Sequence, residues 1–178
     1  MKRVNVIGTS GSGKSHFSQK LAEKMGVPYI QLDAIYWQPN WSEPSNEAFF
    51  ADLKSAISAD VWVLDGNHSK TNPIKWQRTD TIIWLDFSFF RTFRQILSRS
   101  IKRAWTKGEI WKGTGNKESF RKSFLSSDSV ILWMLTNYTK TKHKYGKLFN
   151  QNDLEETKLI RIRSPREAAL FLKYTQKI

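Results

Sequence analysis

Eight residues near the start of the chain have the types and spacing that bind phosphate, Gly8-Thr9-Ser10-Gly11-Ser12-Gly13-Lys14-Ser15. They fit the pattern G-x-x-x-x-G-K-[ST] at every fixed position. Glycines let the backbone turn tightly, so that several N–H groups point at one anion. We expect Lys14 to reach the β- and γ-phosphates of ATP and the Ser15 hydroxyl to ligate Mg²⁺. The predicted cofactor contacts are Gly8, Ser10, Gly11, Ser12, Gly13, Lys14, Ser15 and His16.

The residues around this loop predict the elements that must position it. An apolar run from Val4 to Ile7 is typical of a strand, and a helical stripe begins at Phe17 and ends before Gly26. A helix that starts at the loop directs its positive N-terminal end at bound phosphate.

Three aspartates follow short apolar runs that we interpret as strands at 29–32, 61–64 and 81–85. Ligands of parallel α/β sheets bind beyond the carboxyl ends of the strands, so Asp33, Asp65 and Asp86 are expected at one edge with the loop. Asp65 has the form of a Walker B carboxylate that holds Mg²⁺, and Asp33 could orient or deprotonate an acceptor hydroxyl. The alternative for both is a turn-forming Asp. Asp86 is expected to cap the next helix.

The remaining pattern predicts one domain over residues 1–178. A fifth strand is expected at 158–162, with helices near 46–57, 88–105 and 126–145 and a last helix at the capping box Ser164-Pro165-Arg166-Glu167. Strands alternating with helices indicate a parallel, three-layer α/β fold. Residues 33–45 are expected to form an aromatic loop, and a glycine-bearing stretch at about 106–121 a mobile lid.

The helix at 88–105 is rich in arginine. Arg99 and Arg103 lie next to the predicted lid and are candidates to stabilise a phosphoryl group during transfer. The alternative is a solvated face. The basic run 140–147 is interpreted mainly as solvated surface, and His68 and His143 lack partners at metal-ligand spacing.

Composition limits the classes of function. The net charge of +13 favours phosphate-bearing partners, from nucleotides to nucleic acid. The absence of Cys fits a reducing compartment, and no apolar run is long enough to span a membrane or to form a signal peptide, so we expect a cytoplasmic protein. No motif for reading DNA or RNA is present, and nucleic acid is therefore not the favoured partner.

Other nucleotide-binding classes lack their motifs here. Residues 116–119, Asn-Lys-Glu-Ser, differ at the last position from the guanine-reading Asn-Lys-x-Asp motif of GTPases, and they fall in the predicted lid. The loop motif, Gln31-Leu32-Asp33 with Trp37 and Trp41, and the run from Trp62 to Asn67 together resemble the FlaR family of DNA-topology modulation proteins. This resemblance covers most of residues 1–105.

The resemblance implies a fold and an activity. The FlaR family is similar to nucleoside monophosphate and shikimate kinases, which implies a P-loop fold with strand order 2-3-1-4-5, ATP with Mg²⁺, and phosphoryl transfer to a small acceptor near Asp33. The acceptor-side residues it implies are Asp33, Trp37, Asp65, Gly66, Lys70 and Arg78. The chain departs from the family pattern with His68 in place of an aromatic residue, Lys70 in place of Arg, and lysines where the lid usually carries arginines. Lysine cannot make the bidentate phosphate contact of arginine.

We therefore predict an ATP-dependent kinase that phosphorylates a small acceptor. A nucleotide-like molecule is one candidate for this acceptor. The predicted catalytic residues are Lys14, Asp33, Arg99 and Arg103, with Ser15 and Asp65 on the metal. The alternatives are a nucleic-acid-associated ATPase or DNA-topology regulator, which the charge favours, and a nucleotide-binding fold that has lost catalysis.

Overall fold

Five parallel strands form the centre of the molecule. The computed structural model describes residues 1–178 except 107–108, 112–113, 118–128, 152–153, 155 and 178. The strands are β1 (Arg3–Gly8), β2 (Tyr29–Gln31), β3 (Trp62–Asp65), β4 (Thr81–Leu85) and β5 (Lys158–Ile162). They form one sheet in the order β2-β3-β1-β4-β5, which confirms the predicted fold class and strand order. The central strand, β1, pairs through Val4 with Val63 of β3 and with Thr81 of β4.

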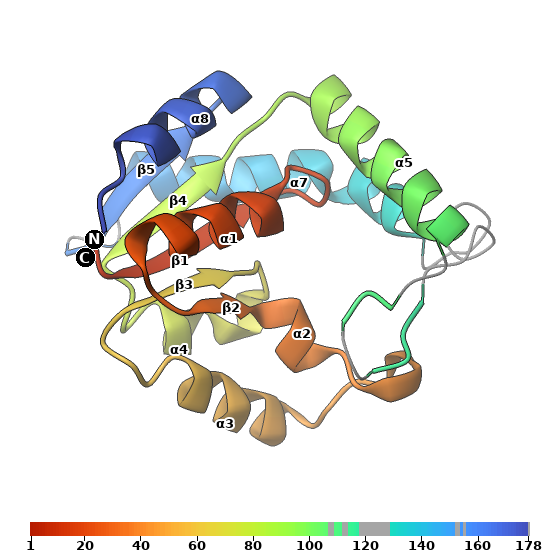
Figure 1. Cartoon of the computed structure of the whole chain (residues 1–178), viewed down its shortest axis with the longest axis horizontal. Coiled ribbons are helices and arrows are strands. Elements are labelled where there is room, and N and C mark those ends of the chain that lie inside the picture. Colours follow the sequence, from red (N-terminus) through yellow and green to blue (C-terminus); the bar gives the residue numbers. More distant parts are fainter. Residues whose placement is uncertain (107–108, 112–113, 118–128, 152–153, 155, 178) are drawn as a thin grey trace.

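Two helices, α1 (Lys14–Met25) and α8 (Pro165–Tyr174), cover one face of the sheet (Figure 1). Phe17, Leu21 and Met25 of α1 are buried against valines of β1 and β3, with Phe171 of α8 beside them. The predicted stripe of α1 is thus its core face. The capping box of α8 is confirmed, since the Ser164 hydroxyl accepts a hydrogen bond from the Glu167 N–H at 3.2 Å.

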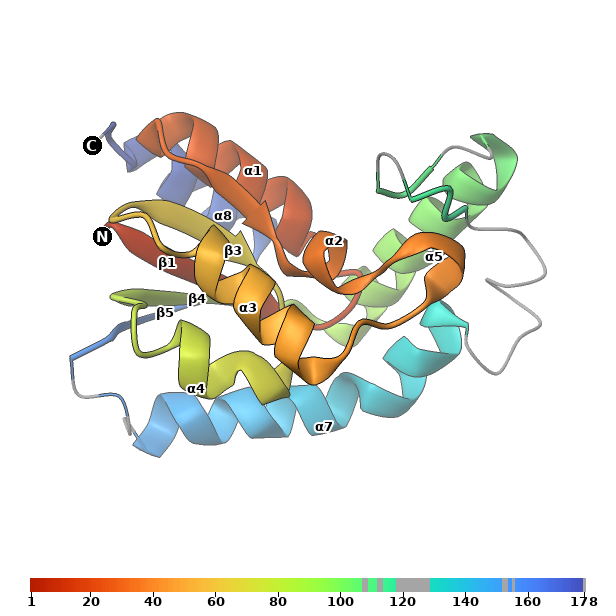
Figure 2. The ribbon, with the colours of Figure 1, turned by 90° about the horizontal axis from the view of Figure 1, so that it is seen from below.

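Three helices lie on the other face, as Figure 2 shows: α3 (Asn46–Ala56), α4 (Asn72–Lys75) and α7 (Val130–Gln151). Helix α3 packs Phe49 and Leu53 on Trp62 of β3. Helix α7 packs Tyr145 on Trp84 of β4, with ring centroids 6.1 Å apart.

The remaining elements lie near the carboxyl ends of the strands. They are α2 (Leu32–Tyr36), the short 3₁₀ helices η1 (Pro39–Trp41) and η2 (Ser69–Thr71), and α5 (Phe89–Thr106). Helix α5 packs on α7 through Ile96 and Met134, both fully buried. This arrangement places α2 and α5 beside the loop between β1 and α1 (Figure 2).

Some predicted boundaries were wrong. The strand predicted at 29–32 ends at Gln31, and the buried Leu32 starts α2, so the predicted 33–45 loop contains α2 and η1. Helix α7 runs to Gln151, six residues beyond the predicted end, and residues 126–128 of the predicted helix lie outside the described ones. On α5, Ile96 is fully buried whereas Ile101 is 49% exposed, because the core cluster of α5 and α7 involves the first half of α5.

Candidate active site

The loop from Gly8 to Gly13 joins β1 to α1 and has a backbone that only glycine adopts easily. Gly11 and Gly13 have φ angles of 83° and 86°. A Cβ atom on Gly11 would lie 2.8 Å from the Ile96 Cβ, so α5 packs directly on the loop. Among the described residues, the buried Ser12 hydroxyl has no hydrogen-bond partner, and Lys14 Nζ lies 3.4 Å from the Thr9 carbonyl oxygen. The loop thus holds polar groups that lack strong partners within the protein.

The Asp65 carboxylate ends β3 and is almost completely buried. Its Oδ2 accepts a hydrogen bond from the Tyr29 hydroxyl at 3.3 Å, whereas Oδ1 has no hydrogen-bond partner within the part of the chain that the structure describes. Burial raises the pKa of Asp65, and the nearby Lys14 ammonium and Ser15 hydroxyl oppose this shift. Desolvation and the Asp65 charge raise the pKa of Tyr29, which keeps that phenol protonated as a donor. Asp65, Lys14 and Ser15 therefore lie close together at the end of β3.

Asp33 lies in the first turn of α2, where its carboxylate is half exposed. Oδ1 lies 3.7 Å from Nε2 of His68, whose ring packs on Tyr36 with centroids 4.3 Å apart. The pKa of Asp33 is lowered although desolvation acts to raise it, because His68, Lys14 and Arg99 favour the carboxylate. Asp33 is therefore an anion at neutral pH and a weak base.

The turn after β3, Asp65-Gly66-Asn67, contacts both the phosphate loop and α2. Asn67 Oδ1 accepts a hydrogen bond from the Gly8 N–H at 3.2 Å, and Asn67 Nδ2 donates to the Gly8 carbonyl oxygen. A Cβ atom on Gly66 would lie 2.4 Å from the Leu32 Cβ, so only glycine allows α2 to begin this close to the turn.

The other predicted site residues divide into two groups. Arg99 is half-buried and close enough to Asp33 to affect its pKa, and Arg103 lies one turn further along α5. Lys70 has an exposed side chain in η2. Arg78 does not belong to the site, because its guanidinium donates to the Ser58 carbonyl oxygen at 2.9 Å, at the opposite edge of the sheet, before β3 begins.

The described part of the predicted lid contacts the aromatic segment after α2. Trp111 lies against Trp37 and Trp41, with ring centroids 6.5 and 5.8 Å away. Asn116 is buried, and its amide donates to the Gln38 carbonyl oxygen and accepts from the Trp41 N–H, both at 2.9 Å. Asn116 is the first residue of the run that partly matches the guanine-reading motif of GTPases. In the structure it joins the predicted lid to residues 38–41. Of the lysines that stand in the predicted lid in place of arginines, Lys117 is exposed, and Lys107 and Lys112 lie outside the described residues.

The prediction that Asp86 caps α5 is wrong. Asp86 Oδ2 accepts a hydrogen bond from Arg161 Nη2 at 2.6 Å, and Oδ1 lies 3.3 Å from Lys142 Nζ. Parallel pairing of β4 with β5 brings Arg161 to this edge, where its guanidinium also stacks on Trp84. Asp86 is therefore a structural ion-pair partner.

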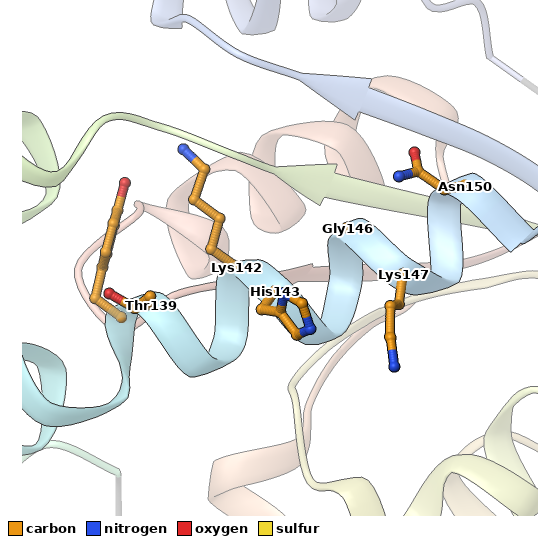
Figure 3. A pocket seen from close by; sticks show the side chains of 7 residues that line it. Thr139, Lys142, His143, Gly146, Lys147 and Asn150 are labelled. Atoms are coloured by element: carbon orange, nitrogen blue, oxygen red, sulfur yellow. The ribbon is translucent and has the colours of Figure 1, made fainter.

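A pocket on α7 includes part of the basic run (Figure 3). Its lining residues are Tyr138, Thr139, Lys142, His143, Gly146, Lys147 and Asn150. The run was predicted to be mainly solvated surface, and two of its lysines make contacts within the protein. Lys142 pairs with Asp86, and Lys144 contacts the Ser69 hydroxyl.

Two kinds of feature are absent from the described part of the chain. Within it, no three His, Cys, Asp or Glu side chains cluster as a metal site. No described helix combines the length and apolar character needed to cross a membrane.

Comparison with known proteins gives partial matches to shikimate kinases. The chain is 39% identical over 62 residues to the shikimate kinase of Gloeobacter violaceus, which is 32% of this chain and 35% of that protein. It is 27% identical over 116 residues to the shikimate kinase of Synechococcus sp. (strain CC9902), which is 57% of this chain and 61% of that protein. The chain thus spans between about a third and three fifths of these relatives. No family model matches the sequence, and the resemblance to the FlaR family stays a prediction.

A solved structure supports the fold. The chain superposes with a TM-score of 0.50 on the crystal structure of a sugar kinase from Janibacter sp. HTCC2649, over 98% of this chain and 95% of that one. At 15% identity this likeness concerns the fold alone.

Three residues that contact the site were not assigned a role from the sequence: Asn67, His68 and the buried Lys75. The Asp-Gly-Asn run was a visible signal for Asn67. His68 and Lys75 belong to no motif in the sequence. Tertiary packing brings His68 to Asp33 and Lys75 to the Gly66 carbonyl oxygen.

Proposed function

We propose that this chain is an ATP-dependent kinase that transfers a phosphoryl group to a hydroxyl of a small molecule. The observation that carries the proposal is that the phosphate loop, Asp65 and Asp33 come together at the carboxyl edge of the sheet. The partial matches to proteins named shikimate kinases support a small alcohol as acceptor. A nucleotide-like acceptor remains part of the proposal.

The residues of the loop fit a triphosphate. Backbone N–H groups between Gly8 and Ser15, the N-terminus of α1 and the unpartnered Ser12 hydroxyl offer donors to phosphate oxygens. Lys14, which makes a long contact with Thr9, would bind the β- and γ-phosphates. ATP supplies the phosphoryl group when bound, and the chain contributes position and charge.

Asp65 and Ser15 fit Mg²⁺. Asp65 Oδ1 is a buried carboxylate oxygen without a partner, and the Ser15 hydroxyl is close enough to lower the Asp65 pKa. Mg²⁺ prefers such oxygen ligands and usually takes only one or two from the protein, the rest being water and phosphate. When bound, it would neutralise phosphate charge.

Asp33 would orient the acceptor hydroxyl by accepting its hydrogen bond. Its lowered pKa makes it an anion and a weak base, which supports orientation over deprotonation. Arg99, near Asp33, and Arg103 would stabilise charge on the phosphoryl group during transfer. Trp37, Gly66 and Lys70 would lie on the acceptor side, and we keep residues 106–121 as the proposed lid.

The first test replaces the lysine of the loop. We expect Lys14→Ala to weaken Mg-ATP binding by about 10- to 100-fold, since hydrogen bonds to charged groups contribute about 1.5–3 kcal/mol, and to abolish phosphoryl transfer. Binding is measured by calorimetry. Transfer is measured with a panel of shikimate, sugars, nucleosides and nucleoside monophosphates.

The matched control is Lys20→Ala, an exposed lysine of the same helix, which should bind Mg-ATP as the wild type does. Unchanged Mg-ATP affinity in Lys14→Ala contradicts the proposal. Tight binding by the wild type without transfer to any acceptor favours a fold that has lost catalysis.

A further inference from the structure

Asn67 continues the pairing between β3 and β1 after the strand ends. The register joins Val6 to Asp65, and the Gly66 N–H then donates to the Val6 carbonyl oxygen at 3.3 Å. Two residues after Asp65 the Asn67 side chain replaces the backbone, because its amide bonds both the N–H and the carbonyl oxygen of Gly8. A side-chain amide offers the same donor and acceptor as a peptide group. The first residue of the phosphate loop is thereby fixed to the turn that carries Asp65.

Lys75, the last residue of α4, contacts the same turn from the interior of the protein. Its side chain is completely buried, and Nζ donates to the Gly66 carbonyl oxygen at 3.2 Å. Asn5 Nδ2 reaches the same oxygen at 3.4 Å, and Trp76 Nε1 orients Asn5 by donating to its Oδ1 at 3.0 Å. Burying a lysine amine is costly unless it is hydrogen-bonded, so its placement on this one carbonyl group is a strong constraint. Either protonation state of the amine can donate this bond.

The turn also determines where α2, which carries Asp33, begins. Gly66 lies directly against Leu32, the residue before Asp33, because only 2.4 Å separates the Leu32 Cβ from the position that a Cβ atom on Gly66 would take. A displacement of the turn would therefore change the positions of Asp65, Asp33 and Gly8 relative to one another.

We propose that Asn67 and Lys75 are positioning residues that hold the Asp65–Asn67 turn against Gly8, and so set the distance between the phosphate loop and the metal-binding carboxylate. Neither side chain needs to touch a substrate, and Lys75 cannot. This inference rests on the proposed function in one respect, that the loop binds Mg-ATP.

The experiment uses the shape-conserving variants Asn67→Leu and Lys75→Met in the full chain. Calorimetry gives the affinity for ATP with Mg²⁺ and with EDTA. We expect Mg-ATP affinity to fall about three- to tenfold in each variant, in line with one or two lost hydrogen bonds, and affinity for ATP in EDTA to fall less. The double variant should lose no more Mg-ATP affinity than the single variant that binds Mg-ATP more weakly, since both substitutions act on the same turn. Lys54→Met, an exposed lysine of α3, is the control.

Equal losses with and without Mg²⁺ overturn the inference, because a residue that only supports the loop fold would lower both affinities alike. The inference is also overturned if Asn67→Leu has the melting temperature of the wild type and binds Mg-ATP with wild-type affinity. Because Asn67 is only half-buried, this variant still tests the inference if Lys75→Met does not fold. If Lys14→Ala weakens Mg-ATP binding while these variants bind Mg-ATP as the wild type does, the inference fails and the proposed function stands. If the wild type binds no Mg-ATP, both fail.

Discussion

The charge state of Lys75 depends on several neighbouring groups. Burial, together with the nearby Lys144 ammonium, lowers the pKa of Lys75 to about 7, while Asp33 and Asp65 act to raise it. An ordinary lysine, as in the unfolded chain, has a pKa near 10.5. Between these two values the unfolded chain binds a proton at Lys75 that the native protein does not, so the stability of the native protein rises with pH across this window.

We predict that the wild type gains stability relative to Lys75→Met between pH 6.5 and pH 9.5. The unfolding free-energy difference should change by about 2–4 kcal/mol in favour of the wild type, because a pKa difference of one between the folded and unfolded states is equivalent to about 1.36 kcal/mol. Urea unfolding of both proteins at pH 6.5, 8 and 9.5 measures it. Lys54→Met corrects for removing an exposed lysine, and a difference that does not vary with pH contradicts the prediction.

Sequence pattern predicted the positions of the phosphate-loop residues and Asp65 better than the positions of the residues assigned to the acceptor side. Lys14, Ser15 and Asp65 come together because a fixed motif and a strand end determine their places. Arg78 was assigned from a resemblance and lies at the wrong edge, since the chain reverses through α4 before β4. His68 and Lys75 acquire their partners only by tertiary packing, which a single sequence does not encode locally.

At the scale of elements, the buried strands and the stripe of α1 were predictable from local pattern. The segment after α2 was not, because contacts distant in sequence determine it. Asn40 and Trp41 adopt positive φ angles of 58° and 60°, unusual for residues other than glycine, and the Trp41 N–H bonds Asn116, 75 residues away. The same long-range contact joins the described part of the proposed lid to η1.

We predict that Asn116→Ala detaches these two segments. It leaves the Trp41 N–H and the Gln38 carbonyl oxygen without their partner, so amide exchange over residues 38–42 should accelerate while exchange in β1 stays unchanged. Global stability should fall by about 1–3 kcal/mol. Hydrogen exchange with mass spectrometry measures the first effect and urea unfolding the second.

The neighbouring exposed Lys117 gives the control, because Lys117→Ala removes a side chain from the same segment without these bonds. Exchange over residues 38–42 that is as slow in Asn116→Ala as in the wild type would show that the tryptophan contacts alone hold the segments together.

At the scale of the whole molecule, the sheet order explains how residues so far apart in sequence form one site. Placing β1 between β3 and β4 brings the loop after β1 next to the turn after β3, and α2 follows from the neighbouring β2. Sequence pattern predicted parallel strands, whereas the order came from resemblance to known kinases. The net charge of +13 is the one whole-chain property that this site does not explain.

We predict that this charge produces only weak, salt-sensitive binding to DNA, separate from the kinase site. Duplex DNA affinity should fall at least about tenfold between 50 and 200 mM salt, because binding of this kind releases counterions from each phosphate contacted. Fluorescence anisotropy with a labelled duplex measures it, and Lys14→Ala should bind as the wild type does. Stimulation of ATP hydrolysis by DNA, or DNA binding that is lost in Lys14→Ala, would instead favour a nucleic-acid-associated ATPase, since the phosphate loop and the DNA-binding surface would then be coupled.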